Sequence, residues 1–315
     1  MASYASDVKK ELTSLEVHAE HAKAELAAFL RMNGVLNLHD HQVSLDIITE
    51  NPAIARRIFS LLKIAYHAEP LLIVSRKMKL KKNNQYLVRL RQNVHQILVD
   101  LEIWDATVGF NTRIPQKIMT SRQRAMSYLR GAFLAGGSVN NPATSRYHLE
   151  IYSTYEDHNQ DLATLMNQYF YLNAKTTQRR RGYIAYLKEA EKIGDFLHVV
   201  GALNAMLAFE DLRIMRDMRN SVNRLVNCDT ANLRKTATAA AKQVEDIQLI
   251  AREQGLDELP EKLAQLARFR VAHPELSLKE VADEVPDGPI SKSGINHRFQ
   301  KLKELADMYR PNQKD

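Results

Sequence analysis

The fold is decided by one stretch, Leu129-Arg130-Gly131-Ala132-Phe133-Leu134-Ala135-Gly136-Gly137-Ser138-Val139. It predicts a helix in which Gly131, Ala132 and Ala135 share a side, because residues three or four apart lie close together on a helix. A wall of such small residues lets a second backbone approach closely. We expect Gly136-Gly137 to end this helix with a residue in the left-handed conformation. A strand at about 147–152 should follow. Taken alone, the stretch would indicate only an ordinary helix end.

A similar stretch occurs about 100 residues earlier in the chain, which is the sign of an internal repeat. The run Leu26-Ala27-Ala28-Phe29-Leu30-Arg31-Met32-Asn33-Gly34-Val35-Leu36 has small residues, a glycine and a β-prone sequence in the same order. Each copy is followed by a strand-like run, a helix-like run, two further β-rich runs and a closing helix. The sequence therefore predicts one domain over residues 1–210, made of two αββαββα-like halves at about 1–112 and 120–210.

This repeat resembles the LAGLIDADG fold of homing endonucleases, in which two such helices pack together at a pseudo-twofold axis. The resemblance implies an acidic residue near the end of each helix, where the two acids hold the divalent ions that cleave DNA. In this chain the two positions are Asn33 and Gly136. Phosphodiester hydrolysis by this design needs carboxylate oxygens to bind the metal. We therefore expect no catalytic residue, no bound metal and no cofactor.

Positive charge gathers in the predicted hairpins of both halves, in a chain of 315 residues with a net charge of +7. Side chains alternate between the faces of a strand, so Lys77 shares a face with Lys79, and Arg89 shares one with Arg91. We interpret these residues as a basic concave surface that contacts nucleic-acid phosphates without reading sequence. A solvated sheet face is the alternative. The candidate phosphate contacts are Lys77, Lys79, Arg89, Arg91, Arg179, Arg180 and Arg181.

Several classes of protein are excluded by what the chain lacks. Its one cysteine, Cys228, excludes an internal disulfide and a cysteine-based zinc site. No apolar run approaches membrane-spanning length, and Met1–Lys10 lacks a signal-peptide core. We expect a soluble protein that does not contact a membrane and that is cytoplasmic and associated with the nucleoid.

A polar segment studded with arginines separates the repeat from the C-terminal part of the chain. Residues 211–228 predict a linker helix, and Asp229 can cap a long Ala-rich helix after it. We assign residues 229–315 to an all-α DNA-binding domain. Within that domain, Ser277 caps a short helix with Glu280 at the capping-box position. A turn containing Pro286, Gly288 and Pro289 follows.

A second helix, 292–308, completes a helix-turn-helix arrangement at about 276–309. Ile295, Phe299 and Leu302 face inward at helical spacing. The outward and flanking side chains can hydrogen-bond to base edges in a major groove. A small helical packing domain with a solvated face is the alternative. The candidate DNA-binding residues are Ser291, Lys292, Ser293, Asn296, His297, Arg298, Gln300 and Lys301.

Taken together, these stretches resemble the sporulation regulator WhiA family, and the resemblance covers nearly the whole chain. Besides the two repeated helices, it is carried by the runs at 219–232 and 290–298. The resemblance implies an α+β protein, with a degenerate two-repeat LAGLIDADG-like N-terminal domain joined to an all-α helix-turn-helix domain. It also implies a non-enzymatic transcription regulator that is linked to sporulation, or to cell division and chromosome segregation. Double-stranded DNA is the expected partner, and another transcription regulator or RNA polymerase is a further candidate.

Two alternatives remain open from the sequence. A residual metal-dependent endonuclease could use carboxylates elsewhere, such as Glu150 or Asp157. Alternatively, the chain could be a protein-binding scaffold in which the former DNA groove receives another regulator and only the C-terminal domain contacts DNA. The operator, the sign of regulation and the oligomeric state do not follow from the sequence.

Overall fold

The computed structural model describes residues 3–39, 42–76, 84–105, 107, 109–144 and 146–310. The chain divides into two compact units, Met1–Asp217 (unit 1) and Met218–Asp315 (unit 2), each with its own buried core. Lys77 and Lys79 lie outside the described residues. Among the helices described, none is long and apolar enough to cross a membrane.

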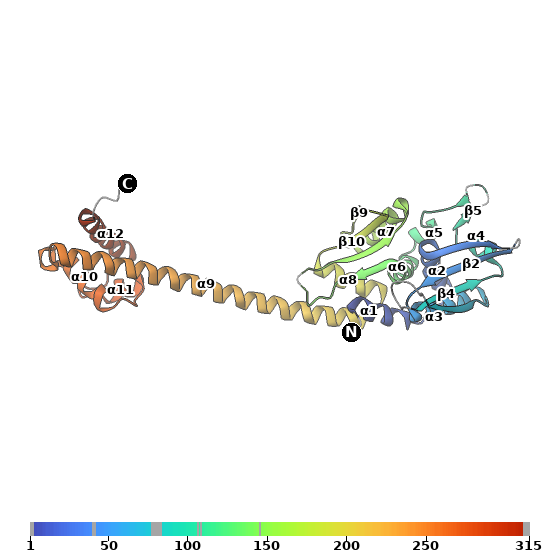
Figure 1. Cartoon of the computed structure of the whole chain (residues 1–315), viewed down its shortest axis with the longest axis horizontal. Helices are drawn as coiled ribbons and strands as arrows, with labels where there is room; N and C mark the ends of the chain where they lie inside the picture. Colours follow the sequence, from blue (N-terminus) through green and yellow to red (C-terminus); the bar gives the residue numbers. More distant parts are fainter. Residues whose placement is uncertain are drawn as a thin grey trace. The chain divides into compact units, whose positions relative to one another are not determined.

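Unit 1 is built from two copies of one arrangement, which confirms the predicted repeat (Figure 1). The first copy consists of α2 (Ala19–Asn33), β1 (Gly34–His39), β2 (Gln42–Thr49), α3 (Pro52–Tyr66), β3 (Leu71–Arg76), β4 (Asn84–Leu90) and α4 (Val94–Asp100). The second consists of α6 (Arg122–Gly136), β7 (Gly137–Val139), β8 (Leu149–Ser153), α7 (Glu156–Phe170), β9 (Lys175–Arg179), β10 (Gly182–Leu187) and α8 (Ala190–Val200). Helix α1 (Tyr4–Thr13) precedes the first copy, and β5 (Trp104–Asp105), β6 (Gly109–Phe110) and α5 (Gln116–Met119) connect the two.

Each copy forms its own four-stranded antiparallel sheet, in the orders β1-β2-β4-β3 and β7-β8-β10-β9. In the first sheet, Leu45 lies opposite Leu90 and Ile47 lies opposite Val88, and all four side chains are buried. In the second, Ile151 and Ala185 are a buried pair. One face of each sheet is therefore packed into the core of unit 1, and the other is available to a partner.

The two repeated helices, α2 and α6, pack together at the centre of unit 1. A Cβ atom added at Gly131 would lie 2.4 Å from the carbonyl oxygen of Glu25 and 3.1 Å from the Cβ of Ala28. The predicted close approach of two backbones is therefore present. Side chains of ordinary size would hold the helices further apart.

The expected left-handed residue at the end of α6 is not found. Gly137 has φ −82° and ψ 152°, and Gly34 at the end of α2 has φ −75° and ψ 136°, so both are extended. Each helix runs directly into a strand. Glycine is needed there for space, since an added Cβ would lie 2.5 Å from the Phe133 carbonyl oxygen at Gly137 and 2.4 Å from the Leu30 carbonyl oxygen at Gly34.

The boundary between the units also differs from the prediction. No separate linker helix and no cap at Asp229 are found, because α9 (Leu203–Glu253) is a single helix of 51 residues. It contains neither glycine nor proline, the residues that most strongly interrupt a helix. The break comes earlier, at Gly201 with φ +94°, which separates α8 from α9. Glu11 then accepts hydrogen bonds from the first N–H groups of α9, those of Asn204 and Ala205.

Unit 2 is all-helical, as predicted. After α9 come a short 3-10 turn (Leu256–Glu258), α10 (Glu261–Ala272), α11 (Leu278–Glu284) and α12 (Lys292–Tyr309). Its core joins the end of α9 to these helices through buried aliphatic and aromatic side chains. They include Ile247, Ile250, Leu266, Val281, Ile295, Phe299 and Leu302.

We expect Gly131→Ala to lower the free energy of unfolding of unit 1 by about 1–3 kcal/mol, because the added methyl group overpacks the α2–α6 contact. The only tryptophan, Trp104, lies in unit 1, so its fluorescence during urea unfolding measures this unit. Gln123→Ala, at an exposed position of the same helix, is the matched control and should change little. Equal unfolding midpoints for the two variants would contradict the close approach.

Candidate nucleic-acid interface

Helices α11 and α12 are held in a helix-turn-helix by local hydrogen bonds. At the start of α11, Ser277 N–H donates to Glu280 Oε2 at 2.7 Å and Glu280 N–H donates to Ser277 Oγ at 3.3 Å. These bonds with Ser277 lower the pKa of Glu280. Ser291 Oγ accepts from Gly294 N–H at 3.2 Å and caps α12. Ile290 N–H donates to Ala282 O at 2.8 Å, which folds the turn back onto α11.

The inner side of α12 anchors the helix. Ile295 is 0% exposed, Leu302 1% and Phe299 5%. Arg270, which the sequence analysis did not identify, is 1% exposed and lies with its guanidinium 5.8 Å from the Phe299 ring centre. Burial lowers the pKa of Arg270, although Glu275 acts in the opposite direction. The sequence signal was that Arg270 lies at helical spacing from Leu263, Leu266 and Ala267, the buried residues of α10. The packed side leaves the opposite side of α12 as the presented surface.

This exposed side of α12 contains most of the residues that were predicted to contact DNA bases. Ser293, Asn296, His297 and Gln300 are exposed, and within the described chain the side chains of Asn296 and His297 have no hydrogen-bonding partner. Gln300 donates to Glu304 at 3.2 Å. This acid lies on the same side, further along the helix, and would repel phosphates there. Ser291 and Lys292 at the start of α12 are exposed as well, and so is Lys301, which lies further along the helix near Glu304.

Arg298 is placed differently from the other predicted contacts. Its Nη2 donates to Asp287 Oδ2 at 2.9 Å, and its side chain is only 18% exposed. Its Nη1 is buried with no partner among the described residues. Arg298 therefore ties α12 to the turn, and it is not presented with the outward group.

The acidic positions of the LAGLIDADG pattern do not form a metal site. Asn33 and Gly136 end α2 and α6. A Cβ at Gly136 would lie 2.8 Å from the backbone oxygen of Tyr152 and 2.8 Å from Met32 Cε. Met32 could move aside, but the Tyr152 carbonyl belongs to β8. Among the described residues, no group of three His, Cys, Asp or Glu side chains could hold a metal ion. The residues present do not fit the metals of a homing endonuclease.

The two carboxylates considered as alternative metal ligands, Glu150 and Asp157, each form an ion pair with an arginine. Glu150 Oε2 is 2.9 Å from His148 Nε2 and 3.0 Å from Arg179 Nη2. Asp157 lies 3.8 Å from Arg113 Nη1. The two acids stand in separate ion pairs, and nothing described brings them together as paired metal ligands.

The two basic hairpins differ in how free their arginines are. Arg89 donates through Nε and Nη2 to both oxygens of Asp46, each at 2.7 Å, and Asn37 donates to the same carboxylate at 2.8 Å. The hydrogen bond and charge of Asp46 raise the pKa of Arg89. Arg89 therefore joins β4 to β2 across the sheet face, while Arg91 just beyond β4 is exposed. A sequence pattern alone could not reveal this pairing.

The second hairpin presents its arginines more openly. Arg180 and Arg181 are exposed at the turn between β9 and β10, and Tyr152 Oη donates to the Arg181 carbonyl oxygen at 2.5 Å. With Arg179, Glu150 and Ile184 they line a shallow hollow of about 630 Å³. Arg179 shares the Glu150 carboxylate with His148. The arginines of the two hairpins that are exposed and form no ion pair with another described residue are Arg76, Arg91, Arg180 and Arg181.

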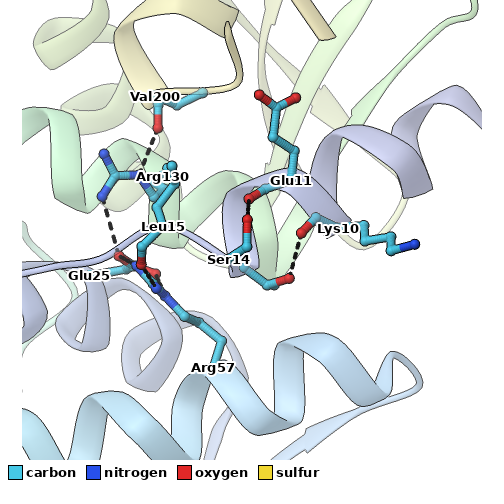
Figure 2. A network of polar contacts seen from close by, with 9 residues as sticks. Lys10, Glu11, Ser14, Leu15, Glu25, Arg57, Arg130 and Val200 are labelled. Carbon is cyan, nitrogen blue, oxygen red and sulfur yellow. Dashed lines mark hydrogen bonds and ion pairs between the residues drawn. The ribbon is translucent and has the colours of Figure 1, made fainter. Parts of the chain in front are cut away.

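A buried ion cluster, not anticipated from the sequence, joins helices of unit 1 (Figure 2). Glu25 of α2 is 0% exposed and accepts from Arg57 Nε at 2.8 Å and Nη2 at 2.9 Å. Arg130 of α6 approaches the same carboxylate at 3.5 Å and donates to the Val200 carbonyl oxygen at 2.6 Å. Burial lowers the pKa of Arg130, and Glu25 opposes this. Arg57 also donates to the Leu15 carbonyl oxygen.

Three family models match successive parts of this chain. They are described as the WhiA N-terminal LAGLIDADG-like domain, at residues 19–104, the WhiA LAGLIDADG-like domain, at 125–219, and the WhiA C-terminal HTH domain, at 222–306.

Similar whole proteins and structures cover almost the full length. A protein named "Probable cell division protein WhiA" from Lactobacillus acidophilus is 81% identical over 310 residues, covering 98% of this chain and 100% of that protein. Its namesake from Lactobacillus helveticus is 82% identical over 307 residues, covering 98% and 99%. The crystal structure of full-length WhiA from Thermatoga maritima aligns with a TM-score of 0.60 at 25% identity, covering 98% of this chain and 99% of that one.

The double substitution Asn33→Asp with Gly136→Asp is expected not to create a nuclease. The new side chain at 136 would collide with the Tyr152 carbonyl oxygen, which lies 2.8 Å from its Cβ, so the two acids cannot converge on a metal without moving β8. Plasmid nicking with Mg²⁺ or Mn²⁺ measures this, with Asn33→Asp alone as the control. Metal-dependent nicking by the double variant that follows the protein through purification would contradict the expectation.

Proposed function

Since the chain belongs to the WhiA family, we propose that it is a sequence-specific DNA-binding transcription regulator that does not cleave DNA. The observation that carries the proposal is the outward side of α12, where Ser293, Asn296 and His297 are exposed on a helix held rigidly by its opposite side. Side chains of this kind hydrogen-bond to base edges in the major groove. Relatives named for cell division support a role there, and the family resemblance adds sporulation and chromosome segregation.

We assign different roles to the predicted DNA contacts. Asn296, His297, Ser293 and Gln300 are the candidates for base contacts, because they point away from the core of unit 2. Ser291, Lys292 and Lys301 are suited to phosphates at the edges of the groove. Arg298 positions the turn through Asp287. Such a protein would act on the chromosome, in the cytoplasm and associated with the nucleoid.

The sheets of unit 1 are proposed to add phosphate contacts, chiefly through the second hairpin. Arg180 and Arg181 are exposed, and β9 offers the polar sequence Lys175-Thr176-Thr177-Gln178-Arg179. Contacts of this kind contribute affinity and salt dependence without sequence preference. Arg91 would extend the same surface into the first half.

A second candidate function, protein binding, is favoured by the first sheet. Its edge strand β3 exposes Leu71, Leu72, Ile73 and Val74 by 39–56%, whereas the equivalent β9 is polar. An exposed apolar edge strand suits pairing with another polypeptide better than contact with phosphates. Another regulator or RNA polymerase could occupy this edge while α12 binds DNA.

Asn296→Ala is expected to reduce the preference for the operator about tenfold, because a good bidentate base contact contributes about 1–3 kcal/mol of discrimination. Non-specific affinity should fall much less. The operator is first identified by sequencing the DNA crosslinked to the protein in cells, and competition binding then compares it with scrambled DNA. Lys303→Ala on the same helix is the control and should leave the ratio unchanged. A wild-type ratio for Asn296→Ala would show that this part of α12 does not read sequence.

Replacing Arg180 and Arg181 by Ala should weaken binding to all DNA sequences alike and reduce the slope of log K against log[salt] by about 1 for each phosphate that the variant no longer neutralises. Lys63→Ala, on the exposed side of α3, is the control with no expected change. Arg91→Ala tests the first sheet in the same titration. A smaller slope in the hairpin variant but not in Arg91→Ala would favour the protein-binding role for the first sheet.

A further inference from the structure

Unit 1 contains a partly open hollow whose lining residues are not among those proposed to contact DNA. It has a volume of about 440 Å³ and lies among α2, the end of α3, the residues after α4, and the segment leading through α5 into α6. This segment is the connection between the two repeated halves. The volume is within the range of about 300–1,000 Å³ typical of small-molecule sites.

The interior of the hollow is apolar and is open because its wall residues are small. Ala24 and Ala27 of α2 are 4% and 1% exposed, and Ala65 near the end of α3 is half-buried. Leu101 and Ile118, each 2% exposed, complete the apolar lining. Larger residues at the alanine positions would fill the space, so the hollow depends on this choice of residues.

Three cations surround this apolar interior. Lys23 Nζ lies 2.9 Å from Asp100 Oδ2, Lys117 Nζ lies 3.1 Å from Glu102 Oε1, and Arg124 Nη2 lies 3.1 Å from Glu20 Oε2. The interior is therefore apolar, and the rim carries three cations, each paired with a carboxylate.

Two of these cations, Arg124 and Lys117, can exchange their carboxylate partner for a ligand at low cost, while Lys117 keeps a hydrogen bond to the Asp100 carbonyl oxygen at 2.6 Å. Glu20 is 76% exposed and Glu102 46% exposed, and ion pairs in such exposed positions contribute only about 0–1 kcal/mol. Asp100 is held more firmly, because it also accepts from Tyr66 Oη at 2.5 Å and so retains Lys23. Arg124 and Lys117 are thus the cations that an incoming anion would meet.

We propose that this hollow is a binding site for a small amphipathic organic anion. The apolar body of the ligand lies against Ala24, Ala27 and Ala65, and its carboxylate, sulfonate or phosphate accepts hydrogen bonds from Arg124 and Lys117. An uncharged ligand would gain no charge-assisted hydrogen bond from these two cations. Because the hollow borders both α2 and the connection into α6, a bound ligand would bridge the two halves of unit 1.

The test uses the full chain and two probes that differ in charge, 2-naphthoate and the uncharged 2-naphthamide. Isothermal titration should show saturable binding of one naphthoate per chain, with naphthamide bound about tenfold more weakly, since it cannot form a charge-assisted hydrogen bond. Arg124→Gln should weaken naphthoate about tenfold and leave naphthamide unchanged. The adjacent Arg122, whose guanidinium instead lies over the Phe170 ring, supplies the matched control Arg122→Gln, which should change neither.

A blocking variant tests the location of the apolar body. Ala65→Leu fills the hollow and should abolish binding of both probes, and Ala19→Leu at an exposed rim position does the same with less risk to folding. Fluorescence of Trp104 confirms that each variant is folded. The proposal is overturned if naphthoate shows no saturable binding, if both probes bind equally, or if the folded blocking variants bind like the wild type.

Discussion

The close contact between α2 and α6 is the constraint on which the rest of unit 1 depends. Two helix backbones meet where Gly131 faces the Glu25 carbonyl oxygen, and the Glu25 side chain is itself buried beside the same contact. A buried carboxylate must be compensated by charge and hydrogen bonds. Arg57 from α3 and Arg130 from α6 provide both (Figure 2). The arginines also bind the carbonyl groups of Leu15 and Val200, so one buried charge ties five segments of the chain together.

The same contact sets what the ends of these helices can do. Both helices pass directly into strands at Gly34 and Gly137, with no loop in which a side chain could be redirected. In the homing-endonuclease pattern this junction carries acids. Here Gly136 lies against the Tyr152 carbonyl oxygen and Met32, so the space for a carboxylate is already filled. The helix pair that positions the two sheets is present, and at Gly136 a side chain would collide with the Tyr152 carbonyl oxygen.

In unit 2, the helix-turn-helix is held by contacts between residues that are close together in the sequence. The capping bonds at Ser277 and Ser291 define where α11 and α12 begin, and Arg298 with Asp287 fastens the turn between them. The Arg270 guanidinium packs over the Phe299 ring. With the inner side of α12 held in this way, the outward side chains can present hydrogen-bonding groups without a large loss of conformational freedom on binding.

The sequence by itself determined the repeat, the helix-turn-helix and the absence of the two acids, because each is encoded by residues close together in the chain. Periodicity, capping residues and the residue types at Asn33 and Gly136 are local properties. Only the tertiary structure decided which basic residues are free. Arg89 and Arg298 were predicted as DNA contacts, and the structure shows each paired with a carboxylate from another segment, Asp46 and Asp287. It likewise decided that glycine ends α2 and α6 for lack of space, that Glu25 is shared by two arginines, and that α9 is continuous. The first two features depend on distances between groups in the folded chain. The third depends on whether a helix continues over many turns, and no short sequence pattern determines that.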